Sequence, residues 1–367
     1  MTLYWNHYSG FPRIALVHNA VIDEHFNCAD GVEVLEISAT AAKFASDGLS
    51  ISIDNNSAFH ALQSGSIVSI NDMGIVYVVY TPTEDDATVF VTGHCNSNCV
   101  MCPSSDMERK NGDGMSEDWM REYLSLLPDS LGHITITGGE PTLRTNFFFE
   151  IMDRIADQFP DTESLLLTNG RSFAAQKFVT RLASHCPQYL RVAIPIHGHT
   201  PYLHDSITQA SGSFNQTCLG IRNLLHNRIS VELRVVASKI NLQALPEIAS
   251  FIAADFPSVT VVNFIGLETR GSCAKNYDQV FCEYKDSAPL IISAIKILTQ
   301  NGIDAAIYNY PLCYIERGYW SICKKSISPD KVRFLPECDL CEARSACGGF
   351  FSTTLSMSKP IVQPIRF

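Results

Sequence analysis

The chain has 367 residues, of which 46% are hydrophobic and 18% are charged, a composition typical of a globular protein with a large core. Its 27 basic and 38 acidic residues give a net charge of −11, which argues against a nucleic-acid partner. The sequence shows no apolar run near the roughly 18 residues of a membrane span and no secretory signal at its start, so we expect a cytoplasmic protein without membrane segments.

Residues 1–86 are expected to form a β-rich N-terminal module. Short β-branched runs alternate here with Asp, Asn, Gly and Ser, as in strands that are joined by turns. The run 66–80 indicates a hairpin that turns at residues 71–74. Because reactive side chains are not concentrated in this part, we expect a small barrel-like structural or docking module.

Residues 87–304 show a different pattern, in which apolar strands alternate with amphipathic helices. The predicted strands are 87–93, 133–139, 164–170, 189–196, 230–238 and 259–267. The predicted helices are 115–128, with Ser116 as N-cap, 144–159, 172–186, 213–227, 244–256 and 288–302. Repeated strand–helix units imply a parallel sheet with right-handed crossovers. We therefore predict an α/β fold, a partial (β/α)6 barrel of the TIM type, with the active site at the C-terminal ends of the strands.

Three cysteines follow the first of these strands at C-x3-C-x2-C spacing: Cys95, Cys99 and Cys102. A structural zinc site takes four ligands, and a thiol redox pair needs only two cysteines. Ordinary electron-transfer clusters also take four cysteines. Three thiolates can hold an iron–sulfur cluster and leave one iron open, so the spacing favours a cluster that binds a substrate or cofactor directly.

A second motif follows the next strand and consists of Gly138, Gly139, Glu140 and Pro141. Two glycines let the backbone approach a ligand closely, and a carboxylate can accept hydrogen bonds from an ammonium group. The two motifs together resemble the radical S-adenosylmethionine (SAM) superfamily. The resemblance implies that the three cysteines bind a [4Fe-4S] cluster and that the second motif meets the methionine amino group of SAM.

The same resemblance implies the chemistry. The open iron binds the amino and carboxylate groups of SAM, and one electron from a flavodoxin- or ferredoxin-type reductant leads to a 5′-deoxyadenosyl radical, which abstracts hydrogen from a substrate carbon. Further SAM contacts are expected at the ends of strands three to six, where a loop cap or a satisfied core polar residue is the alternative for each: Thr168, Asn169, His197, Arg234, Phe264 and Ile265. The sequence assigns no catalytic side chain that acts on the substrate.

Residues 305–367 are expected to be irregular and rich in cysteine. Cys338, Cys341 and Cys347 have C-x2-C-x5-C spacing, and a four-sulfur site suits either zinc or an iron–sulfur cluster. Beside a radical SAM core, this tail resembles the auxiliary-cluster extension of peptide-modifying members. The resemblance implies a second [4Fe-4S] cluster whose fourth ligand is Cys313, with Cys323 as the alternative.

The tail also resembles a narrower group, the radical SAM maturases of the His-Xaa-Ser system. The matching segments are 310–320, 325–331 and 335–353. This resemblance implies a ribosomal precursor peptide as substrate, with a second radical SAM maturase and a small accessory protein as partners. The alternative is a radical SAM enzyme that acts on a small molecule or a protein and uses the tail cluster as an electron conduit. Three scattered cysteines, Cys28, Cys186 and Cys218, are expected to be buried apolar residues.

Overall fold

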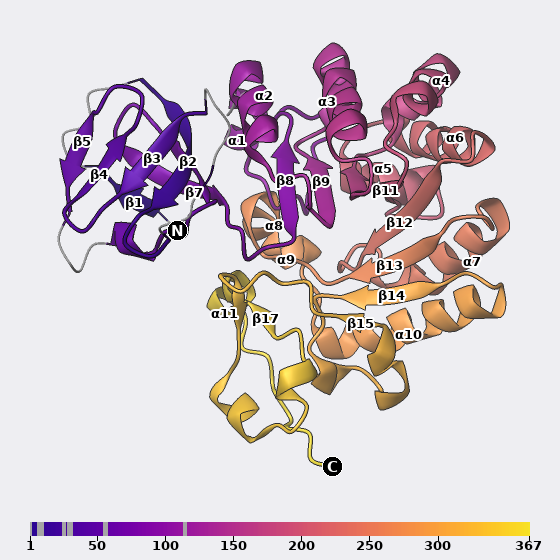
Figure 1. Ribbon diagram of the computed structural model, residues 1–367. Coiled ribbons are helices and arrows are strands. Elements are labelled where there is room, and N and C mark those ends of the chain that lie inside the picture. Colours follow the sequence, from indigo (N-terminus) through magenta and orange to yellow (C-terminus); the bar gives the residue numbers. More distant parts are fainter. Residues whose placement is uncertain (1, 6–10, 24–26, 28–31, 54–57, 113–115) are drawn as a thin grey trace.

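The computed structural model describes residues 2–5, 11–23, 27, 32–53, 58–112 and 116–367. Figure 1 shows an N-terminal sheet beside a larger curled sheet, whose helices lie on its outer side, and a C-terminal segment that packs below the last strands. Cys28 and Met115, on which two of the predictions fall, lie outside the described residues. In the described part, none of the helices has the length and apolar character that crossing a bilayer requires.

In the residues that the structure describes, the N-terminal sheet has seven strands in the order β1-β7-β6-β2-β3-β4-β5. Their bounds are β1 (Thr2–Tyr4), β2 (Arg13–Asn19), β3 (Val34–Ile37), β4 (Ala41–Phe44), β5 (Ser50–Ser52), β6 (Ile67–Ile70) and β7 (Ile75–Tyr80). The predicted hairpin is confirmed, because β6 and β7 pair antiparallel and the Gly74 amide donates to the Asn71 carbonyl at 3.0 Å. Trp5 stacks on Phe44 at 5.2 Å inside a separate apolar core.

The larger sheet has eight strands that are all parallel and follow one another in sequence order. Their bounds are β8 (Asp86–Phe90), β9 (His133–Thr137), β10 (Glu163–Leu167), β11 (Leu190–Pro195), β12 (Ser230–Val236), β13 (Val261–Ile265), β14 (Ala305–Tyr308) and β15 (Cys323–Lys324). The sheet curls into a half-barrel (Figure 1), which confirms the predicted α/β class and partial barrel. Sequential order places every crossover helix on the same outer side.

Residues 305–308 differ from the prediction, which placed them in an irregular tail. They form β14 and pair with β13 in parallel register, because Ala305, Ala306 and Ile307 are apolar and bury their side chains in the core. The sheet thus has two strands more than expected. The proposed division of the chain at residue 304 stays a prediction.

The predicted helices are all present, and their bounds are α2 (Glu117–Leu126), α3 (Thr145–Gln158), α4 (Gln176–His185), α6 (Ser213–His226), α7 (Leu245–Asp255) and α10 (Tyr284–Gln300). Ser116 is the N-cap of α2, as expected, and its hydroxyl accepts from the Trp119 amide at 3.1 Å. The N-terminal module contacts this region, since the Trp119 indole donates to Ser69 Oγ at 3.2 Å. The α3 helix buries its three consecutive phenylalanines, and two of them, Phe148 and Phe149, pack on Phe178 of α4.

Several short elements were not predicted, because they are too short to show an apolar period. They are α1 (Asp106–Asn111), α5 (Pro201–Thr208), α8 (Gly271–Lys275), α9 (Tyr277–Val280), α11 (Ser352–Met357), β16 (Val332–Arg333) and β17 (Phe350–Phe351). The α1 and α8 helices follow β8 and β13, so they belong to loops at the C-terminal ends of the strands. These loops form the edge of the half-barrel at which the cysteines lie.

Candidate active site

The three cysteines of the first motif lie in the loop between β8 and α1 and line one cavity of about 270 Å³. The cavity lies where the parallel strands end. Six of the other residues predicted from sequence also line it: Gly138, Gly139, Thr168, Asn169, Arg234 and Ile265. The fold therefore brings together side chains and backbone from the ends of β9, β10, β12 and β13 around the cysteine loop.

The cysteine thiols lie in a poorly solvated wall. Burial, together with the neighbouring thiols of Cys102 and Cys95, raises the pKa of Cys99 to about 12. Burial also raises the pKa of Cys95, although the Ser97 amide donates to its sulfur at 3.4 Å. Closely spaced thiolates are unfavourable in such a place unless a metal compensates their charge, and metal ligation deprotonates thiols. The donor set fits a bound iron–sulfur cluster.

Gly138 and Gly139 pack directly against the loop that leads to Cys95. The Gly139 amide donates to the Thr92 carbonyl at 2.7 Å, and the Glu140 amide donates to the His94 carbonyl at 2.7 Å. A Cβ atom on Gly138 would overlap the Thr92 carbonyl oxygen. A Cβ atom on Gly139 would overlap the carbonyl oxygens of Gly93 and His94. Close approach of two backbones therefore requires both glycines.

Glu140 is fully buried, and its hydrogen bonds connect the ends of β9 and β10. Its carboxylate accepts from the Thr142 amide (3.1 Å) and hydroxyl (2.5 Å), from the Thr168 hydroxyl (2.8 Å) and from the Asn169 amide (2.7 Å). Burial raises the pKa of Glu140, whereas these four donors oppose that rise. Both oxygens are thus occupied by protein donors, and at this wall the cavity is lined by the two glycines rather than by the carboxylate.

Three predicted contacts lie in the structure around the cavity rather than on its lining. Pro141 begins a buried 3-10 turn, and Phe264 is fully buried in β13. The His197 amide donates to His204 Nδ1 at 3.2 Å, and its carbonyl accepts from Asn241 at 3.1 Å. Burial lowers the pKa of His197 to about 3 and that of His204 to about 4, so both rings are neutral near pH 7. A role for these residues in SAM binding stays a prediction.

Arg109 lines the cavity, although the sequence analysis did not single it out. Its guanidinium donates to the Ser104 carbonyl (2.9 Å), Asn98 Oδ1 (2.8 Å) and Ser272 Oγ (2.8 Å), and it pairs with Asp106. It thereby ties the cysteine loop to α1 and α8, and its charge opposes the rise in the pKa of the Cys99 thiol. In sequence it stands beside Lys110 at the end of a short polar helix, which resembles an ordinary solvated surface.

The α8 helix packs closely on the same loop. Gly271 has a left-handed backbone (φ 57°), and a Cβ atom there would overlap the Pro103 carbonyl oxygen. The Cys273 amide donates to the Cys102 carbonyl at 3.2 Å, and the Cys273 side chain is buried. The sixth-strand loop therefore shapes the cysteine loop from one side.

The tail cysteines gather around a second, small apolar cavity. It is lined by all four residues of the predicted set: Cys313, Cys338, Cys341 and Cys347. Backbone amides of Leu312 and Gly349 donate to the Cys347 sulfur at 3.4 Å, and the Ile365 amide donates to Cys341 at the same distance.

Cys323 is not part of that lining, and its thiol donates instead to the Tyr319 carbonyl at 3.5 Å. Burial, together with the thiols of Cys347, Cys338 and Cys341, raises the pKa of Cys313 to about 12. Within the described ranges, His, Cys, Asp and Glu side chains form no group of three or more that is placed to hold a single metal ion. The tail instead presents four sulfurs around a cavity, with Cys313 rather than Cys323 as the fourth.

The remaining scattered cysteines lie outside both cavities. Cys218 is buried, as predicted, on the inner side of α6. Cys186 is only partly buried, because it caps the C-terminus of α4 at the rim of the core.

Comparison with known proteins places the cavity in a family context. Residues 89–252 match the family model of the radical SAM superfamily. The core of the chain is thus similar to radical SAM domains. The match begins in β8 and ends in α7, so it includes the three cysteines and the Gly-Gly-Glu-Pro motif.

The curated relatives cover part of the chain. The mycofactocin maturase MftC of Mycobacterium tuberculosis (strain CDC 1551 / Oshkosh) is 30% identical over 162 residues, which are 44% of this chain and 39% of the relative. The antilisterial bacteriocin subtilosin biosynthesis protein AlbA of Bacillus subtilis (strain 168) is 24% identical over 194 residues, 51% of this chain and 42% of the relative. The chain thus spans about two fifths of the length of these relatives. Among solved structures, Streptococcus suis SuiB bound to S-adenosylmethionine has 13% identity and a TM-score of 0.48, over 60% of this chain and 50% of that chain.

Proposed function

We propose that this chain is a radical SAM peptide maturase in which Cys95, Cys99 and Cys102 bind a [4Fe-4S] cluster and, with it, SAM. The observation that carries the proposal is the single cavity at the C-terminal edge of the half-barrel, where three thiols meet the Gly-Gly backbone and the polar ends of neighbouring strands. The names of the two relatives, a mycofactocin maturase and a bacteriocin biosynthesis protein, support a peptide as substrate.

A cluster held by Cys95, Cys99 and Cys102, with SAM bound beside it, would supply one-electron radical chemistry. The chain's own residues would bind and orient SAM and shield the reactive species from water. The Gly-Gly backbone offers carbonyl acceptors to an ammonium group, and Arg234 offers a guanidinium to a carboxylate. Much of the remaining wall is apolar and keeps water from a reactive species: Leu167, Ala193, Pro195, Val236 and Ile265.

We further propose that Cys313, Cys338, Cys341 and Cys347 bind an auxiliary [4Fe-4S] cluster. Their shared cavity and the three amides that donate to their sulfurs support this set, since such hydrogen bonds stabilise thiolate ligands and tune cluster potentials. The tail segments that resemble His-Xaa-Ser maturases support a precursor peptide of that type as substrate. A second radical SAM maturase, an accessory protein, a flavodoxin- or ferredoxin-type reductant and a cytoplasmic location belong to the same proposal.

The test is reductive SAM cleavage by the full chain, reconstituted anaerobically with iron and sulfide and reduced with dithionite. The wild type is expected to form 5′-deoxyadenosine, and the Cys99→Ala variant is expected to form none. Cys186→Ala is the matched control, because Cys186 lies at the end of α4 outside both cavities. Product formation by Cys99→Ala at the wild-type rate would contradict the assignment of the site.

The substrate class needs a separate measurement. A synthetic peptide with His-Xaa-Ser repeats is incubated with the reduced chain and SAM, and its mass is followed alongside a peptide in which His and Ser are replaced by Ala. A mass change confined to the repeat peptide supports the His-Xaa-Ser assignment. Equal treatment of both peptides, while SAM is cleaved, contradicts the assignment and leaves the radical SAM activity intact.

A further inference from the structure

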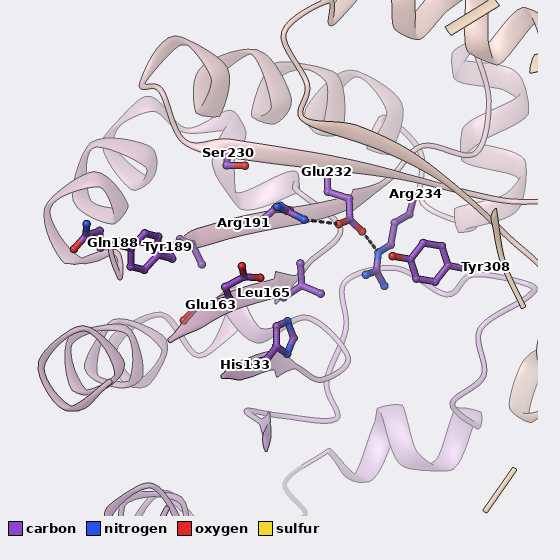
Figure 2. Close-up of a pocket in the computed structure, with 12 residues that line it drawn as sticks. His133, Glu163, Leu165, Gln188, Tyr189, Arg191, Ser230, Glu232, Arg234 and Tyr308 are labelled. Carbon is purple, nitrogen blue, oxygen red and sulfur yellow. Dashed lines mark hydrogen bonds and ion pairs between the residues drawn. The ribbon is translucent and has the colours of Figure 1, made fainter. Parts of the chain in front are cut away.

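A second and larger cavity, here called the lower cavity, lies on the inner face of the half-barrel at the other end of the strands. Its volume is about 510 Å³, and it is lined from β9, β10, β11, β12 and β14 (Figure 2). His133, Glu163 and Ser230 on its wall are the first residues of their strands, so the lower cavity lies opposite the cysteine loop. Arg234 lines both cavities. The lower cavity therefore adjoins the proposed SAM site.

The lower cavity contains two guanidinium groups and one deeply buried carboxylate. The Glu232 side chain, only 4% exposed, lies between Arg191 and Arg234 (Figure 2). Arg234 Nε donates to Glu232 Oε1 at 2.7 Å, whereas Arg191 Nη1 lies 3.9 Å from Glu232 Oε2, beyond hydrogen-bond distance. One carboxylate thus faces two cations in this group of three, and Glu163, at the start of β10, is a second carboxylate on the cavity wall.

The hydrogen bonds of Arg191 are incompletely satisfied. Its Nε atom is buried and has no hydrogen-bond partner among the described residues. Tyr308 faces the same group, and burial followed by the charge of Glu232 raises the pKa of its phenol, so the phenol stays protonated and can donate. The Arg191 side chain as a whole is 43% exposed, so a ligand can reach the guanidinium, and a planar two-oxygen anion matches its donor geometry best. The arrangement fits a carboxylate better than a neutral group.

We propose that the lower cavity binds a carboxylate of the substrate on Arg191, beside the proposed SAM site. The inference rests on the proposed function and adds a specificity determinant to it. The strand register gives the distance between the two cavities along the strands: Glu232 pairs with Ala193, and Arg234 pairs with Pro195. Two residues along a strand span about 7 Å. A carboxylate bound at the level of Glu232 therefore lies about 7 Å from the backbone level of Arg234 and Pro195, which both line the cysteine-lined cavity, although the Arg234 guanidinium itself contacts Glu232.

Two kinds of molecule carry a carboxylate about 7 Å from the group that would enter the cysteine-lined cavity. One is a peptide with an acidic residue about two positions from the modified one, since an extended chain advances about 3.3 Å per residue. The other is a small dicarboxylic acid that binds without a peptide. The shared chemistry is the carboxylate, and the experiment separates the two sources.

The experiment is calorimetric titration of the full chain, under anaerobic conditions, with acetyl-Ala-Asp-Ala-amide, with its Asn counterpart and with glutarate. We expect an acid to bind and the Asn peptide not to bind. Arg191→Gln is expected to weaken Kd at least tenfold, because charge-assisted bonds are lost. Arg191→Lys keeps the positive charge but loses the two parallel N–H donors of the guanidinium, so its Kd is expected to lie between those of the wild type and Arg191→Gln. Arg222→Gln is the control, because Arg222 pairs with Asp255 and is not part of the lower cavity.

The outcomes separate cleanly. Tighter binding of the Asp peptide identifies an acidic residue of a peptide, and tighter binding of glutarate identifies a small dicarboxylic acid. Binding of neither acid overturns the inference, as does unchanged acid binding by an Arg191→Gln variant whose circular dichroism shows a normal fold. The titration does not depend on SAM cleavage. An inactive chain that still binds the acid through Arg191 would therefore refute the proposed function but not the carboxylate site.

Discussion

Substitution of Gly139 by alanine tests whether close backbone approach forms the cysteine loop. The new Cβ atom would overlap the carbonyl oxygens of Gly93 and His94 and would lie 2.7 Å from the His94 carbonyl carbon. Carbon atoms pack at about 3.5 Å or more, so one backbone must move by roughly 0.8 Å. Movement of the loop stretches the 2.7 Å bond from the Glu140 amide to the His94 carbonyl and displaces the residue directly before Cys95.

The expected cost combines overpacking, about 1–3 kcal/mol, with a weakened hydrogen bond, about 1 kcal/mol. We expect Gly139→Ala to lower the Tm of the chain by a few degrees and to lower its iron content and SAM cleavage markedly, because the first cysteine ligand is displaced. Thermal unfolding, iron content after reconstitution and 5′-deoxyadenosine formation measure the three effects.

Gly318→Ala is the matched control for this substitution. A Cβ atom on Gly318 meets nothing within 4 Å, and its backbone is not left-handed. This variant is expected to behave like the wild type in all three measurements. If Gly139→Ala kept wild-type iron content and SAM cleavage, the packing of the two loops would not be what positions the cysteines, and the reasoning would be refuted.

Two further predictions concern the tail and the pH dependence of folding. Cys313→Ser is expected to remove about four irons from the reconstituted chain, whereas Cys323→Ser is expected to keep them. Of these two cysteines, only Cys313 lines the tail cavity. The reverse result would identify Cys323 as the ligand. Burial lowers the pKa of His204 from 6.5 to about 4. Between these pH values the unfolded chain therefore binds more protons than the folded chain. The free energy of unfolding is expected to fall as the pH drops from 6.5 towards 4, by about 3 kcal/mol from this residue. His204→Asn is expected to flatten the dependence of Tm on pH across that range relative to His226→Asn, an exposed control; equal slopes would contradict the assignment.

The parts of the fold that depend on local patterns were predictable. Apolar runs with β-branched residues gave the six strands from β8 to β13, and the 3.6-residue period gave the long helices between them. The motifs at residues 95–102 and 138–141 were recognisable because their spacing is short and their positions follow consecutive strands. Short elements such as α1 were not predictable, since six residues show too little of a period.

The uses of individual polar side chains depended on contacts that are distant in sequence. Glu140 appears in sequence as a loop carboxylate available to a ligand, but Thr168 and Asn169, some 28 residues later, occupy its oxygens. Arg234 was noticeable as a charge within an apolar strand. Its relation to Arg191 arises only from the register of β11 and β12, which single-sequence patterns do not contain.

The central claim is that two separate cysteine groups hold two clusters, one of them at the SAM site. The most direct measurement is the anaerobic iron and sulfide content of the wild type and of a Cys95→Ala/Cys99→Ala/Cys102→Ala triple variant. The account predicts about eight irons per chain for the wild type and about four for the variant. An iron content that the triple substitution leaves unchanged would contradict it.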